Sequence, residues 1–144
     1  MNFECRQNNR ELWLELIFDL SHIEYQKRVW VEASLPGIVS GFRETTNTYF
    51  DNLDLADGYD YFIMEGIVTK QEAEIVIEFH NLLKSYTSQV GKRSLSDRHV
   101  IRDPEWIMLT EVALRTWTQL KTAISNKEEH KFMDSLERNF ISGQ

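Results

Sequence analysis

The chain has 144 residues, of which 42% are hydrophobic and 27% charged, and its formal net charge is −7. This composition is typical of one globular domain and argues against extensive disorder, and no uncharged apolar run of about 18 residues predicts a membrane span. The acidic balance opposes binding to nucleic-acid phosphates, while Cys5, as the single cysteine, rules out an internal disulfide.

The first part of the chain has helical periodicity. Apolar residues advance by threes and fours over residues 10–33. Ser21 and Glu24 have the spacing of a capping box, which predicts two helices bent at residues 19–21. A Pro-Gly pair at 36–37 then ends the run.

The next part of the chain is less regular. Residues 37–50 are interpreted as a helix, although their threonines would suit a strand equally well. Residues 51–57 read as a polar connection, and residues 59–65 as a short helix that ends at Gly66.

Three cap signals organise the second half of the chain. Thr69 followed by Glu72 is a capping box, which predicts a helix over residues 70–86. A small, basic loop is expected over residues 87–102. Asp103 and Asn126 are then the predicted caps of helices over 104–124 and 127–140. We therefore expect an all-α fold: one domain, 1–144, built as a bundle of five to seven helices.

The net charge is concentrated in residues 51–78, where eight acids face one base; the remaining residues are balanced. Four aspartates recur every third residue at 51, 54, 57 and 60. A calcium loop of EF-hand type would need oxygen ligands before Gly58 and a glutamate six positions after it, but Leu53, Leu55 and Met64 stand there. A looser carboxylate site remains an alternative: a small helical enzyme using a divalent metal, with Asp54, Asp57, Glu74 and Glu78 as its first candidates.

No catalytic motif accompanies these acids. The four histidines lie far apart in the sequence, so we expect each to be structural. There is no serine nucleophile elbow and no glycine-rich phosphate loop. Arg98 and Arg102 in the basic loop could meet a phosphate, but the overall charge opposes it. We assign no catalytic residue, no metal ligand and no cofactor.

Residues 49–65 mix large aromatics with acids, and tyrosines surrounded by matching charge are typical of protein interfaces. The predicted partner-binding residues are Tyr49, Asp51, Asp54, Asp57, Tyr59, Asp60, Tyr61, Glu65, Glu74 and Glu78. A basic protein is the partner that this charge favours. In the competing interpretation Tyr59, Phe62 and Ile63 fold into the core, and the aspartates only solubilise a loop.

In size, charge and cysteine content, and in the run Asp57-Gly58-Tyr59-Asp60-Tyr61-Phe62, the chain resembles the small acidic immunity proteins of bacterial toxin–immunity pairs. The likeness is to the class and carries over no individual functional residue. It implies a cytoplasmic, non-enzymatic protein that occludes a basic, nuclease-type toxin. The N-terminal residues, which lack the basic and apolar stretches of a secretory signal, agree with a cytoplasmic expectation. The oligomeric state is left open.

Overall fold

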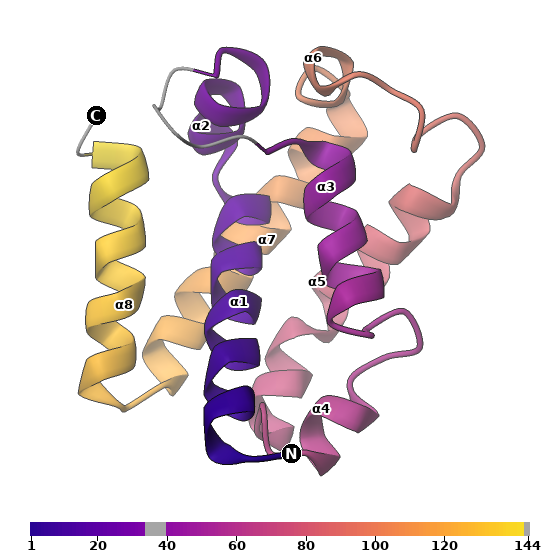
Figure 1. Ribbon diagram of the computed structural model, residues 1–144. Coiled ribbons are helices and arrows are strands. Elements are labelled where there is room, and N and C mark those ends of the chain that lie inside the picture. Colours follow the sequence, from indigo (N-terminus) through magenta and orange to yellow (C-terminus); the bar gives the residue numbers. More distant parts are fainter. Residues whose placement is uncertain (34–39, 143–144) are drawn as a thin grey trace.

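The computed structural model describes residues 1–33 and 40–142, and these residues form a helical bundle without strands (Figure 1). The α-helices are α1 (Phe3–Ser21), α2 (Ile23–Tyr25), α3 (Phe42–Asn47), α4 (Asp60–Met64), α5 (Lys70–Ser88), α6 (Asp97–Val100), α7 (Pro104–Ala123) and α8 (Lys127–Glu137). Three π-helical segments, η1 (Gln26–Val31), η2 (Thr48–Asn52) and η3 (Arg138–Ser142), extend α2, α3 and α8. The all-α class is confirmed. The expected number of helices is wrong, because the described residues contain eight.

Two helix starts that the sequence interpretation missed are each explained by a single capping side chain. α1 begins at Phe3 rather than near residue 10, since the side chain of Asn2 accepts a hydrogen bond from the Cys5 amide at 2.8 Å. α6 lies inside the predicted loop, where the Ser96 hydroxyl accepts a bond from the amide of His99. In both places one polar side chain satisfies an amide that the helix start would otherwise leave unpaired.

The bend after α1 is real, but the predicted capping box does not form. Ser21 donates its hydroxyl to the carbonyl of Phe18 at 3.0 Å instead, and His22 adopts an extended conformation between α1 and α2. Gln26 holds the bend from inside the core: its Nε2 donates to the Asp19 carbonyl at 3.0 Å, and its Oε1 accepts from Trp106 Nε1 at 2.8 Å. The bend is thus fixed by a contact with α7. The Pro-Gly pair at 36–37 lies outside the described residues.

The predicted starts of α5, α7 and α8 are confirmed. Both hydrogen bonds of the Thr69–Glu72 capping box are present, at 2.9 and 3.1 Å. Asp103 accepts from the Glu105 amide at 3.0 Å, and Asn126 accepts from the Glu129 amide at 3.0 Å. Local caps therefore decide where the long helices of the second half begin.

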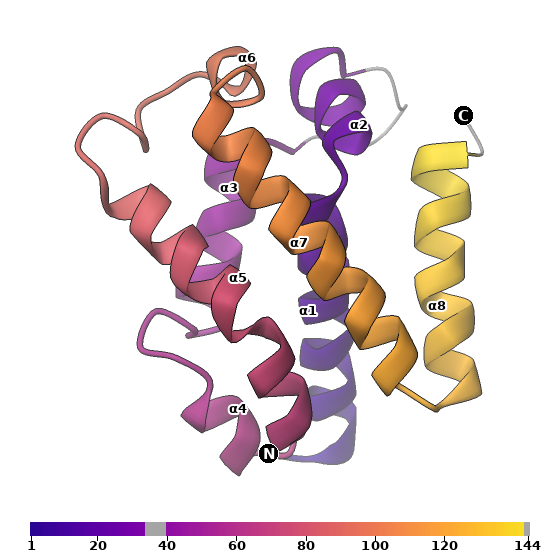
Figure 2. The ribbon, with the colours of Figure 1, turned by 180° about the vertical axis from the view of Figure 1, so that it is seen from behind.

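α1 runs through the middle of the molecule, with α3 and α8 beside it (Figure 1), while α5 and α7 pack against each other on the opposite side (Figure 2). Aromatic rings fill the space between these helices. Trp106 lies within 5.1–6.2 Å, centroid to centroid, of the rings of Trp30, Phe42 and Tyr86. The largest fully buried side chains are Trp13, Trp106, Trp117, Tyr49, Tyr86, Phe18, Phe42, Phe62 and Phe79.

Arg10 on α1 joins the beginnings of α5 and α8. Its guanidinium makes a bidentate pair with Glu72 at 2.7 and 2.8 Å and a second pair with Glu129 at 2.5 and 3.1 Å. It also donates to the carbonyl of Ile67 at 2.9 Å. All five N–H donors of the side chain are therefore used. Burial, which opposes ionisation, is outweighed by the bonds from Arg10 and Thr69, so the pKa of Glu72 lies below its usual value.

Candidate functional site

The connection after η2 alternates buried leucines with exposed aspartates. Leu53 and Leu55 point into the core, and Asp54 between them is exposed in a left-handed conformation with φ 58°. The amides of the two leucines donate to the carbonyls of Thr48 and Phe50 at 3.0 and 3.2 Å. These buried anchors force the intervening carboxylate outward.

Six acidic side chains of residues 51–78 are exposed, and we call this set the acidic edge. Its members are Asp51, Asp54, Asp57, Asp60, Glu74 and Glu78. None of them forms an ion pair within residues 1–33 and 40–142. The two other acids of this stretch are engaged, since Glu72 binds Arg10 and half-buried Glu65 lies 3.4 Å from the amino group of Met1. The acidic edge is the part of the stretch whose carboxylates form no ion pair in the described part of the chain.

A buried chain of hydrogen bonds lies beneath the acidic edge. Trp13 Nε1 donates to the hydroxyl of Tyr59 at 2.7 Å, the Tyr59 and Tyr49 hydroxyls are 2.8 Å apart, and the Tyr49 hydroxyl is 2.9 Å from His80 Nδ1. We call these four residues the tyrosine network. It joins α1, η2, the start of α4 and α5. It therefore fixes the connection that carries the aspartates against the helix that carries Glu74 and Glu78.

The tyrosine network has one arrangement in which every hydroxyl proton finds an acceptor. Tyr59 accepts from Trp13 and donates to Tyr49, which donates to His80 Nδ1. This requires a neutral His80 whose Nδ1 carries no proton. Burial lowers the pKa of His80, and the charge of Lys84 lowers it further. Burial also raises the pKa of both tyrosines, so the network is uncharged at neutral pH.

Two of the predicted partner-binding tyrosines are therefore core residues. Tyr49 and Tyr59 are 0% and 5% exposed, and Phe62 beside them is also buried. The prediction that these two tyrosines present a contact surface is corrected, because both are buried and their hydroxyls lie 2.8 Å apart inside the bundle. The competing interpretation places Tyr59 in the core, but not Tyr49. Tyr61 is 39% exposed and keeps its place on the surface. No sequence spacing links residues 13, 49, 59 and 80, which explains why the network was not anticipated.

The basic loop is partly occupied by contacts within the chain. Lys92 pairs with Asp103, which also accepts a hydrogen bond from Tyr86 at 2.8 Å. Arg93 donates to the side chain of Asn47 at 2.8 Å. Together these contacts hold the loop against the end of α3 and the start of α7. The pair with Asp103 neutralises one of the basic charges that a phosphate ligand would need.

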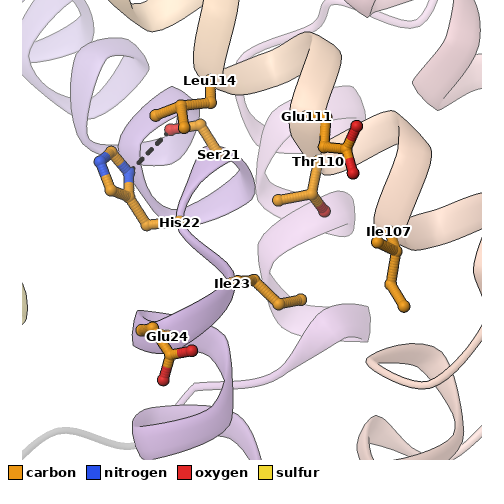
Figure 3. Close-up of a pocket in the computed structure, with 8 residues that line it drawn as sticks. All are labelled: Ser21, His22, Ile23, Glu24, Ile107, Thr110, Glu111 and Leu114. Carbon is orange, nitrogen blue, oxygen red and sulfur yellow. Dashed lines mark hydrogen bonds between the residues drawn. The ribbon is translucent and has the colours of Figure 1, made fainter.

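A second surface feature lies at the break between α1 and α2, and we call it the α7 groove. The more enclosed of its two hollows, which we call the main hollow, has a volume of about 280 Å³ and a largely apolar lining. Figure 3 shows Ile23 pointing toward α7 from the break, opposite Ile107 and Thr110. The remaining lining residues are Ser21, His22, Glu24, Glu111 and Leu114. A shallower hollow continues along α7 past Leu114. The sequence interpretation did not predict this surface.

The carboxylates proposed for a divalent metal do not gather. Within residues 1–33 and 40–142 no three His, Cys, Asp or Glu side chains are placed to share an ion. Asp54 and Asp57 lie on the connection, whereas Glu74 and Glu78 lie on α5. The geometry therefore offers no support for the metal-dependent alternative.

Comparison with known proteins identifies no relative: no family model, no curated protein and no solved structure matches the chain. Within the described part of the chain, no helix is both long and apolar enough to cross a membrane.

Proposed function

We propose that this protein is a non-enzymatic binding module whose acidic edge docks a basic protein. The observation that supports the proposal is the set of six exposed carboxylates without an ion pair in the described part of the chain. Unpaired surface charge of one sign speeds the encounter with an oppositely charged partner and selects against partners of the same charge. Tyr61, half-exposed within the same stretch, supplies an aromatic contact.

The tyrosine network suits this role because it holds the acidic edge in one shape. Phe50 and Tyr59 lie 6.0 and 5.4 Å, centroid to centroid, from the ring of His80 on α5. A preorganised surface loses less conformational entropy when it binds. In the most specific version of the proposal, the partner is a basic toxin that the protein neutralises by occlusion.

The proposal is tested by affinity capture from the native host with three forms of the protein. The edge variant carries Asp51→Asn, Asp54→Asn, Asp57→Asn and Asp60→Asn. The control variant removes four exposed charges elsewhere, through Glu4→Gln, Glu11→Gln, Glu24→Gln and Glu128→Gln. We expect a basic protein to be recovered by the wild type and the control variant and lost from the edge variant.

Equal losses in the two variants would show that net charge alone is recognised, which would contradict a defined edge. Recovery of no basic protein by any of the three forms would count against the proposal as a whole. For the toxin version, the recovered partner should inhibit growth when expressed alone, and co-expression with the wild type should remove the inhibition.

A further inference from the structure

The outer face of α7 carries opposite charges that do not pair with each other. Glu111 and Arg115 are one turn apart and both exposed, and neither forms an ion pair within the described part of the chain. A glutamate four residues before an arginine is the favourable order for a pair on one helix. Each charge is instead open to a group from outside the chain.

Apolar side chains flank these charges. Ile107 and Leu114 are 39% and 44% exposed, and both line the main hollow of the α7 groove (Figure 3). Glu111 and Leu114 are shared with the shallower hollow, which Arg115, Thr118 and Gln119 complete. α7 itself lies at the front of the molecule in Figure 2. The surface thus combines two protruding aliphatic side chains, two hollows and one charge of each sign.

We propose that the α7 groove is covered by the α7 groove of a second copy of this chain. In a twofold contact residue i of one copy meets residue j of the other, and the reverse contact forms as well. With α7 antiparallel to its copy and the axis midway between Glu111 and Arg115, each Glu111 comes level with the other copy's Arg115. The same operation brings Ile107 of each copy level with Gln119 of the other, over the shallower hollow.

The charges match those of a second copy and favour the antiparallel orientation over the parallel one. A parallel arrangement in register would place Glu111 opposite Glu111 and Arg115 opposite Arg115, which is repulsive. The antiparallel arrangement forms two ion pairs and buries both leucines beside the axis. This surface is separate from the acidic edge, and the inference does not rest on the proposed function.

The experiment measures mass in solution as a function of protein concentration, by light scattering and sedimentation at low salt. We expect the wild-type mass to rise from that of one chain toward that of two. Glu111→Arg and Arg115→Glu should each weaken the dimer by roughly tenfold, because each replaces two attractions with two repulsions. Glu111→Arg combined with Arg115→Glu should restore the association, since the pairs re-form with exchanged signs.

Leu114→Asp should also reduce association, and Met64→Asp on α4, at a more exposed position outside both hollows, should not. Circular dichroism checks that each variant keeps its helical content. A wild type that stays monomeric up to millimolar concentration would overturn the proposal. That outcome covers the alternatives in which a small apolar molecule or another protein fills the groove. A dimer that the double exchange fails to restore would overturn it too.

Discussion

Every hydroxyl proton of the tyrosine network has an acceptor only while His80 is neutral. If Nδ1 is protonated it must donate to Tyr49, which then donates to Tyr59, and the Tyr59 proton is left without a partner within the network. A buried polar group without a partner costs about 1–3 kcal/mol. The hydrogen-bond pattern and the lowered pKa of His80 therefore have the same physical consequence: the folded state resists protonation of this ring.

We accordingly expect acid to weaken the fold through His80. The unfolded ring takes up its proton near pH 6.5, and the folded ring does so at a lower pH, because burial lowers its pKa. Below about pH 6.5 the unfolded state thus binds more protons, so the contribution of His80 is complete above that pH and is lost as the pH falls through the folded pKa. Urea unfolding at pH 7 and pH 5 should show a smaller loss for His80→Gln than for the wild type.

Two other groups with shifted pKa values, His22 and Asp19, also contribute to the pH dependence of stability. The wild type must therefore be compared with His80→Gln. The pKa of His22 is also lowered, chiefly by burial, so His22 acts in the same direction as His80. Burial and the charge of Glu15 raise the pKa of Asp19, so Asp19 acts in the opposite direction. The wild-type curve alone is a sum over all such groups, including Glu15, whose pKa is raised by burial. Identical pH dependence in the wild type and His80→Gln would contradict the assigned role of His80.

Some helix-capping side chains also accept hydrogen bonds from residues outside the helix that they cap, and others do not. Asn126 caps α8 through the Glu129 amide at 3.0 Å. Asp103 caps α7 through the Glu105 amide and, in addition, accepts the hydroxyl proton of Tyr86, a residue that is 1% exposed. The two caps are similar in sequence context, but only one also satisfies a side chain of another helix.

From this difference we expect unequal costs for the same change. Asn126→Ala should lower the free energy of unfolding by about 1 kcal/mol, the usual value for a lost cap. Asp103→Ala should lower it by about 2–3 kcal/mol, since it also removes the acceptor of the Tyr86 hydroxyl. Urea unfolding measures both. Asp103→Asn keeps one oxygen for the cap but replaces the oxygen that accepts from Tyr86 with an amide donor, so it should recover only the capping part of the loss. Equal costs for the two alanine variants would refute the second role.

The elements that could be predicted are those whose boundaries are set by interactions between residues close together in the sequence. α5, α7 and α8 begin where Thr69, Asp103 and Asn126 indicate, because each cap acts within a few residues. The bend after α1 depends instead on the contact of Gln26 with Trp106, 80 positions away in the sequence. The exposure of the aspartates followed from their polarity, whereas the burial of Tyr49 follows from contacts with Tyr59 and His80 that no spacing reveals.

The charge of the whole molecule is unevenly placed, and this has a cost for the fold. The repulsion among the carboxylates of the acidic edge is not offset by any ion pair in the described part of the chain, as the proposed binding surface would lead one to expect. The control set is different: Glu24 and Glu128 lie 3.4 and 3.3 Å from Lys27 and Lys131.

We therefore expect the four-aspartate edge variant to melt higher than the wild type at low salt, by roughly 1–3 °C. The four-glutamate control variant should melt at the wild-type temperature or below it. High salt should shrink the gain, because it screens the repulsion that the variant removes. Thermal melts at low and high salt provide the measurement. A lower melting temperature for the edge variant would mean that the aspartates are structural.

The contacts of the Arg10 guanidinium limit when the native fold can form during synthesis. It belongs to the first helix, yet its partners are Ile67, Glu72 and, at the start of the last helix, Glu129. During synthesis Arg10 leaves the ribosome long before Glu129 has been added to the chain. A nascent chain that has not yet exposed Glu129 must carry this cation only partly matched, so the native junction of α1, α5 and α8 can close only after Glu129 has left the ribosome.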